Sequence, residues 1–152
     1  MMSTGNGLLL CSLFFFMSAV VHAQPLARHQ WQHRVVLIFA EAPTTGAVQE
    51  QLAVLRKQKE GLAERDLMIY RVGTETGIMP SGKKLPLQDV LALRQKYAAD
   101  QPHFRFLLLG KDGTEKWRTD EQASTEELFA RIDRMPMRRA EMRRQKKDDG
   151  GG

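Results

Sequence analysis

The stretch RVVLIFAEAPTTGAVQEQL, residues 34 to 52, decides the fold of this chain. Residues 34 to 40 are a continuous apolar run behind one arginine and are rich in β-branched side chains, which predicts a central strand covered on both faces. A short turn follows, and a helix is expected to begin at Gly46. The point where a buried strand turns into a helix is a favoured place for a reactive group. Yet the turn holds no cysteine, serine or histidine.

The residues after this turn predict an amphipathic helix and then a second strand. Apolar side chains recur near helical spacing between residues 46 and 66, with polar and charged residues on the other side, and we expect fraying near Gly61. LMIYRV, residues 67 to 72, is the second strand. Because the joints are short, the three elements predict a βαβ unit with parallel strands and a right-handed crossover.

A loop, a helix and a hairpin are expected next. Residues 73 to 86 contain three glycines and two prolines without periodicity, which indicates a long surface loop. Residues 87 to 99 predict a helix with one face made of Leu87, Val90, Leu91 and Tyr97. FRFLLLGKDGTEKWR, residues 104 to 118, reads as two strands joined at Asp-Gly, a strong hairpin signal.

The last helix opens with STEELFARIDRM, residues 124 to 135. Ser124 is the expected N-cap, with Glu127 three residues on as in a capping box. The buried stripe is expected to consist of Leu128, Phe129, Ile132 and Met135. Pro136 should end or kink this helix and could start another turn. The whole order predicts one α/β domain with a mixed sheet: a βαβ unit, a helix, a β-hairpin and a C-terminal helix.

The first residues indicate export. LLLCSLFFFMSAVV, residues 8 to 21, is an apolar run of 14, too short to span a bilayer comfortably, although no Lys or Arg precedes it. We expect residues 1 to 23 to be a signal peptide cleaved near Ala23, which would make the protein periplasmic or secreted; an uncleaved anchor is the alternative. Cys11 is the only cysteine, so residues 24 to 152 have no thiol chemistry and no disulfide.

Positive charge is concentrated near the end of the chain. Residues 134 to 147 hold seven Lys or Arg against one acid, within a formal net charge of +5 for the whole chain. Clustered arginine without interleaved aromatic residues suits the phosphate or sulfate groups of a polymer or lipid headgroup rather than sequence-specific nucleic acid. The candidate polyanion-binding residues are Arg134, Arg138, Arg139, Arg143, Arg144, Lys146 and Lys147. We interpret residues 136 to 152 as a basic helical extension with a disordered end; a solvated helix that only aids solubility is the alternative.

The order of elements resembles the thioredoxin-like fold, in which the first long strand ends in a turn that carries the redox cysteines. The chain is also similar to a domain-of-unknown-function family in small secreted bacterial proteins and in vertebrate secreted proteins that include sushi-repeat-containing ones. The segments that carry this resemblance are WQHRVVLIFA at 31 to 40, GLAERDLMIYRV at 61 to 72, FLLLGKDGTEKWR at 106 to 118 and ELFARIDRMPMRRAEM at 127 to 142. The resemblance implies a thioredoxin-like or peroxiredoxin-like three-layer sandwich over residues 24 to 135, with no settled activity.

The redox roles of that fold do not carry over. The position of the two cysteines is taken by Pro43, Thr44, Thr45 and Gly46, which form neither a thiolate nor a disulfide. Pro102 lies too early to be the thioredoxin cis-proline. Arg105 stands near that place and is similar to the peroxiredoxin arginine that supports the peroxidatic thiolate.

Two roles are open to the turn from Pro43 to Gly46, which we call the degenerate turn because it lacks the redox cysteines. We expect one of its threonines to cap the following helix through its side-chain oxygen rather than to act as a nucleophile. Thr44, Thr45 and Arg105 could together bind an anion at the helix start. The alternative for Arg105 is a strand-edge arginine in solvent or paired with an acid.

Two histidines in HQWQH, His29 and His33, have the i, i+4 spacing of metal ligands on a helix, but no cluster completes such a site, so we expect no metal. Trp31 is expected to pack over the sheet edge. Three single carboxylates lie at the ends of predicted elements. Turn and capping roles explain Asp66 and Asp112. Asp133 is expected to form an ion pair on the helix surface with the neighbouring Arg134 and Arg138.

These observations favour a non-catalytic binding module without a cofactor, which would engage a polyanion or an envelope partner. Two alternatives stay open. One is a peroxiredoxin-like oxidoreductase that depends on a bound cofactor or a partner thiol, and the other is a structural, matrix-associated protein. The fold by itself does not choose among them.

Overall fold

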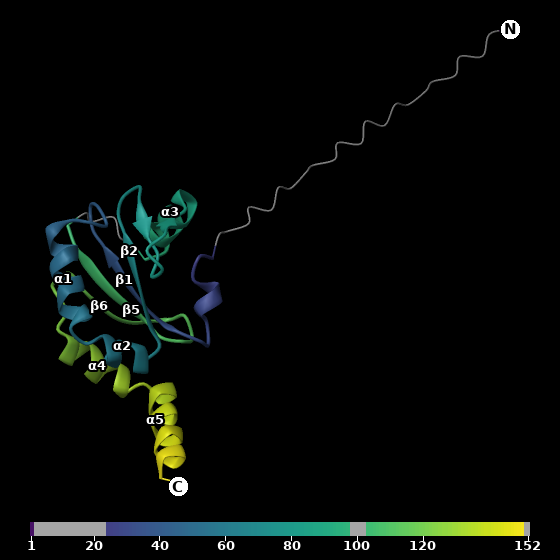
Figure 1. Cartoon of the computed structure of the whole chain (residues 1–152). Coiled ribbons are helices and arrows are strands. Elements are labelled where there is room, and N and C mark those ends of the chain that lie inside the picture. Colours follow the sequence, from purple (N-terminus) through teal and green to yellow (C-terminus); the bar gives the residue numbers. More distant parts are fainter. Residues whose placement is uncertain (2–23, 98–102, 151–152) are drawn as a thin grey trace.

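A six-stranded mixed sheet forms the centre of the protein (Figure 1). This computed structural model describes Met1 and residues 24–97 and 103–150 of the chain. The strand order is β4-β3-β2-β1-β5-β6. The strands are β1 (Arg34–Phe39), β2 (Leu67–Val72), β3 (Gly77–Ile78), β4 (Lys84–Leu85), β5 (Arg105–Leu109) and β6 (Glu115–Thr119). Strand β1 pairs in parallel with β2 and antiparallel with β5, which confirms the βαβ unit.

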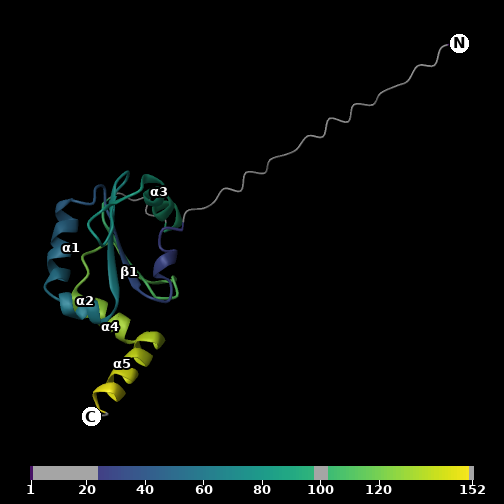
Figure 2. The same ribbon diagram turned by 45° about the vertical axis from the view of Figure 1, so that its right-hand side comes forward.

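Helices cover both faces of this sheet. On one side lie α1 (Gly46–Arg56), α2 (Lys59–Glu64) and α4 (Thr125–Asp133); on the other lie α3 (Leu87–Lys96) and the short 3₁₀ helix η1 (Ala27–His29) (Figure 2). Helix α5 (Pro136–Asp149) follows α4 and projects away from the body. The result is the expected three-layer α/β sandwich.

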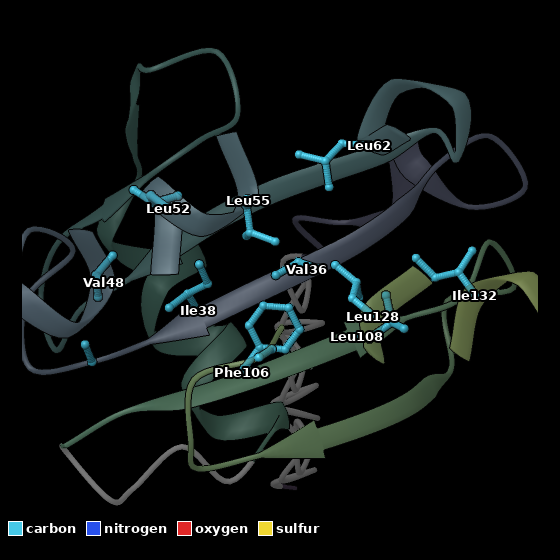
Figure 3. Close-up of a cluster of buried hydrophobic side chains, with 12 residues drawn as sticks. Val36, Ile38, Val48, Leu52, Leu55, Leu62, Phe106, Leu108, Leu128 and Ile132 are labelled. Carbon is cyan, nitrogen blue, oxygen red and sulfur yellow. The ribbon is translucent and has the colours of Figure 1, made fainter. Parts of the chain in front are cut away.

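The two faces of β1 build two hydrophobic cores. Val36 and Ile38 belong to the core beneath α1, whereas Val35, Leu37 and Phe39 belong to the core beneath α3. In Figure 3, side chains from α1, α2 and α4 converge on β1 and β5. Every residue of β1 is buried, so this strand is an unbroken apolar run rather than an alternating one.

The helix expected over residues 46 to 66 is broken in two, and the break is not at Gly61. Gln58 separates α1 from α2 with a non-helical backbone at φ −116° and ψ 39°. Gly61 instead lies inside α2, where an added Cβ would come within 2.7 Å of the Phe129 ring on α4. The glycine is therefore needed for close helix packing, not for fraying.

The expected loop at residues 73 to 86 contains a small hairpin that extends the sheet. Strand β3 pairs antiparallel with β2 and with β4, and Gly82, with φ +83°, lies in the turn between them. Strands of two residues are too short to show a periodic pattern in the sequence. The expectation of an irregular loop was wrong for this reason.

Helix α3 begins as expected at Leu87 and ends at Lys96. Its predicted face was wrong in part, because Leu87 and Leu91 are 53% and 52% exposed. The buried side chains of this segment are those of Val90, Leu93 and Tyr97, which pack into the core beneath α3. Pro102 and the end of the predicted helix lie outside the described residues.

The second half of the fold otherwise matches the sequence patterns. Strands β5 and β6 form the predicted Asp-Gly hairpin, with a register shift at Leu108/Leu109. Ser124 caps α4, since its Oγ accepts from the Glu127 backbone N–H at 3.1 Å. Pro136 occupies the start of α5.

The expected signal segment lies outside the described residues apart from Met1. No helix of the described part is long and apolar enough to cross a membrane.

Candidate functional site

The turn between β1 and α1 is built by backbone contacts. The Thr74 N–H donates to the carbonyl oxygen of Glu41 at 3.1 Å, and Gly73 approaches so closely that an added Cβ would lie 2.8 Å from Pro43 Cδ. Pro43 is buried and Thr44 is exposed. The residues that follow β2 thus pack tightly against the turn, and Thr44 is exposed to solvent.

The predicted side-chain cap of α1 is absent. Thr45 is the N-cap residue, with an extended backbone at φ −60° and ψ 159°, but its hydroxyl accepts no capping hydrogen bond. Its Oγ1 is buried without a hydrogen-bond partner among the described residues. Residue type and spacing indicated a capping role, but the side chain is turned inward where no donor reaches it.

Arg105 lies at the same end of the sheet, opposite Phe39 in the register of β1 and β5. Its Nε and Nη2 donate to the two carboxylate oxygens of Asp120 at 2.6 and 3.0 Å. The hydrogen bond from this guanidinium lowers the pKa of Asp120. Phe106 belongs to the core beneath α1, and successive side chains of a strand point to opposite faces. The side chain of Arg105 therefore lies on the face of the sheet away from α1 and from the threonines at its start. The structure therefore pairs Arg105 with an acid and does not bring it together with Thr44 and Thr45.

The two histidines of HQWQH do come together. Their Nδ1 atoms lie 3.3 Å apart, and Nε2 of His29 lies 2.7 Å from the hydroxyl of Tyr70 on β2. His29 is buried, and burial, reinforced by the nearby Arg28 and His33, lowers the pKa of His29 to about 4. No group of three or more His, Cys, Asp or Glu that could hold a metal ion occurs in the described ranges.

Trp31 does not cover the sheet edge as expected. It is 63% exposed and has a left-handed backbone with φ 67°. Its N–H donates to the carbonyl oxygen of Lys111 at 2.6 Å. Held at this backbone contact, the residue turns the chain into β1 and directs its ring to solvent.

The beginning of α5 is fastened to the body through Arg138, which is only 1% exposed. This guanidinium donates to the Glu64 carboxylate, to the Glu64 carbonyl oxygen at 3.1 Å and to Asp133 at 3.3 Å. Arg65, which is distant in the sequence, also binds Asp133, at 2.7 Å. Asp133 therefore pairs with the predicted Arg138 and with Arg65. Arg138 was expected to bind polyanions, but the fold buries it in an ion-pair network.

Glu141 fastens the next turn of α5. Its carboxylate accepts from both terminal nitrogens of Arg34 at 3.2 Å and lies 2.8 Å from Nζ of Lys111, which also binds Asp66 at 2.7 Å. Burial by itself would raise the pKa of Glu141, but the hydrogen bonds from Lys111 and Arg34 outweigh it and leave the pKa lowered. A single acid within a run of cations is the one signal of this contact that the sequence contains.

The rest of α5 is exposed and basic. The spacing i, i+4, i+7, i+8 places four residues on one face of the helix, and no acid interrupts it. This basic stripe consists of Arg139, Arg143, Lys146 and Lys147. None of the four forms an ion pair with another described residue. Arg134 and Arg144 are exposed outside the stripe, and Asp148 and Asp149, expected in a disordered end, belong to α5.

Comparison with known proteins assigns the body of the chain to a family. Residues 25–141 match the family described as Domain of unknown function (DUF4174). The chain belongs to this family. The matched segment ends at Glu141, so it includes both residues that fasten α5, whereas most of the basic stripe lies beyond it.

The fold has a counterpart among solved structures. The chain is similar to the reduced 2-Cys peroxiredoxin of Plasmodium vivax, with 17% identity, a TM-score of 0.52, and coverage of 71% of this chain and 80% of that one. At this identity the likeness concerns the fold alone, and it agrees with the thioredoxin-like architecture expected from the order of elements.

Proposed function

We propose that this DUF4174 protein is an exported, non-catalytic binding module that engages a polyanion through the basic stripe of α5. The observation that carries the proposal is a row of four cations without an ion-pair partner among the described residues, on a helix whose first turns are fastened to a folded body. A fixed helix presents its charges at regular spacing, so less conformational entropy is lost on binding than with a flexible basic tail.

The chemistry of the stripe suits repeated phosphate or sulfate groups. Arginine donates to such groups in a bidentate manner, and lysine binds them as a point charge. The attraction between exposed charges weakens as salt rises, because the Debye length is only about 8 Å at physiological ionic strength. We therefore expect binding that is strong at low salt and that tolerates different anionic polymers.

Export and the lack of catalysis rest on the sequence. The apolar run at residues 8 to 21 supports a cleaved signal peptide, and a mature N-terminus at Gln24 in the exported protein would identify it. No cysteine occurs in residues 24 to 152, and within the described residues the hydroxyl of Thr45 in the turn has no hydrogen bond to a base. Consumption of a hydroperoxide by the purified protein in the presence of a thiol reductant would contradict the hypothesis of a non-catalytic module.

Point substitutions test the binding site better than deletion of the tail, because deletion would also remove Arg138 and Glu141. The stripe variant carries Arg139→Gln, Arg143→Gln, Lys146→Gln and Lys147→Gln. The matched control removes the same number of exposed charges from the body as Lys57→Gln, Lys59→Gln, Lys83→Gln and Lys84→Gln. Retention on immobilised heparin and on polyphosphate is then compared across a salt gradient.

We expect the stripe variant to elute at much lower salt than the control, which should stay near the wild type. Equal loss in both variants would mean that net charge alone governs retention. Unchanged retention of the stripe variant would exclude α5 as the binding surface.

A further inference from the structure

A pocket of about 250 Å³ lies between η1, α3 and the turn that joins β5 to β6. It sits beside the start of β1, at the opposite end of the sheet from the turn at Pro43. Its floor is apolar, formed by Val35, Leu93 and Leu109, all of which are buried. Its size and apolar floor suit a small organic molecule rather than a polymer.

A chain of close polar contacts leads from Arg28 through Tyr70 and His29 to His33 beside this pocket. Arg28 can only donate, and its Nη2 lies 2.7 Å from the hydroxyl oxygen of Tyr70, so the single Tyr70 proton is free to go to His29 Nε2, also at 2.7 Å. With the Tyr70 proton on this bond, we assign the His29 proton to Nδ1, which then donates to Nδ1 of His33 at 3.3 Å. The lowered pKa of His29, about 4, agrees with a neutral ring. In this assignment His33 carries its proton on Nε2, for which the described residues provide no acceptor.

The charges of the described residues that line the pocket are unbalanced. Lys96 lines it, with Nζ 5.4 Å from the centre of the Tyr97 ring, and has no acidic partner in the described part of the chain. Among the described residues of the lining, Asp112 is the only carboxylate, and it is already engaged by Lys116 at 2.7 Å and by the N–H and hydroxyl of Thr114. A cation without an acidic partner among the described residues and an N–H donor, both above an apolar floor, are suited to an anionic ligand.

We propose that this pocket binds a small organic carboxylate. The carboxylate lies between Lys96 and Nε2–H of His33, and the apolar part of the ligand contacts Val35, Leu93 and Leu109. This site is separate from the basic stripe and does not depend on polyanion binding. It also gives the His29–Tyr70 pair a positioning role, because these two residues hold His33 in the tautomer that donates.

The test uses protein expressed from the full 152-residue sequence, so that any N-terminal processing takes place. Benzoate and its neutral counterpart benzamide are titrated separately while long-range ¹H–¹⁵N spectra report on the histidine rings. We expect saturable shifts at His33 with benzoate, and binding of benzamide about tenfold weaker because it lacks the charge.

Two lysine variants locate the anion. Lys96→Gln should weaken benzoate binding about five- to tenfold. The control Lys57→Gln changes a lysine that is also exposed but lies at the end of α1, on the other side of the sheet, and should leave benzoate binding unchanged. Equal binding of benzoate and benzamide, an unaffected Lys96→Gln variant or no saturable shift would each overturn the proposal. So would stoichiometric binding of zinc ions at both histidines, since it would replace the hydrogen-bond chain with a metal site.

Discussion

Replacing Glu141 by alanine should destabilise the whole fold, although this residue lies on the projecting helix α5. Its carboxylate neutralises Arg34, the first residue of β1, whose side chain is 1% exposed. After the substitution, the Arg34 guanidinium would stay buried with one remaining acceptor, the carbonyl oxygen of Arg65 at 3.0 Å. The strand at the centre of the sheet would then begin with an uncompensated charge.

The magnitude follows from the bonds lost. Arg34 loses two hydrogen bonds to a carboxylate and Lys111 loses one, each worth about 1.5 to 3 kcal/mol where a charge is involved. Lys111 keeps Asp66, and water can reach Arg34 if α5 shifts, so the sum is an upper limit. Removing one partner of a buried pair costs about 3 to 5 kcal/mol, and the partial exposure of Glu141 places the expected loss near 3 kcal/mol.

The assay is urea unfolding followed by circular dichroism, with Glu75→Ala as the control. Glu75 is an exposed acid of the β2–β3 connection and forms no ion pair with a described residue. Its replacement should change the free energy of unfolding by less than about 0.5 kcal/mol. Hydrogen exchange should also show faster exchange along α5 in the Glu141 variant.

The pH dependence gives an independent check. The folded pKa of Glu141 lies below its ordinary value of 4.5, so its contribution is complete above that value and is lost as pH falls through the folded pKa. The difference in stability between wild type and variant should therefore shrink in acid. A Glu141→Ala protein within about 0.5 kcal/mol of the wild type at neutral pH would refute the reasoning.

Three further predictions concern single residues. The pKa of His29, about 4, lies below its ordinary 6.5, so the stability that it contributes is full above pH 6.5 and falls by roughly 2 kcal/mol on going to pH 5. Urea unfolding of His29→Gln should lack this part of the pH dependence, and an unchanged profile would argue against a buried neutral ring. Thr45→Val should shift the free energy of unfolding by less than about 0.5 kcal/mol, because its hydroxyl has no partner among the described residues. Ser124→Ala should lower the free energy of unfolding by about 1 kcal/mol, and equal losses in the two variants would show that both hydroxyls cap. Gly73→Ala should lower thermal stability by about 1 to 3 kcal/mol because its Cβ would meet Pro43, and a neutral result would mean that the turn yields easily.

Sequence patterns predicted the elements that depend on near neighbours. The hairpin followed from Asp-Gly between two runs, and the cap of α4 followed from Ser124. The same reasoning was wrong for the cap of α1, where Thr45 occupies the expected position but its hydroxyl faces an interior without donors. Position along the chain selects a capping residue, whereas packing decides where its side chain points.

The candidate site shows the same division. The spacing of His29 and His33 is one that metal ligands on a helix have. In the structure, however, His29 contacts the hydroxyl of Tyr70, which lies 41 residues away in the sequence. The cluster of basic residues was evident from composition, yet sequence could not separate Arg138, which is buried, from Arg139, which is exposed. A charge in the sequence does not show which acid will reach it.

The sequence by itself determined the order of the main elements, the parallel βαβ unit and the absence of a redox thiol after residue 23, because periodicity, turn residues and composition are local properties of the chain. Only the tertiary structure decided that α5 is fastened to the body, since Arg34 and Glu141 are 107 residues apart and meet only when the sheet and α4 are in place. It also decided which cations stay free. Burial and long-range pairing arise from the packing of distant segments, and that packing divides one basic run into a structural part and an exposed part.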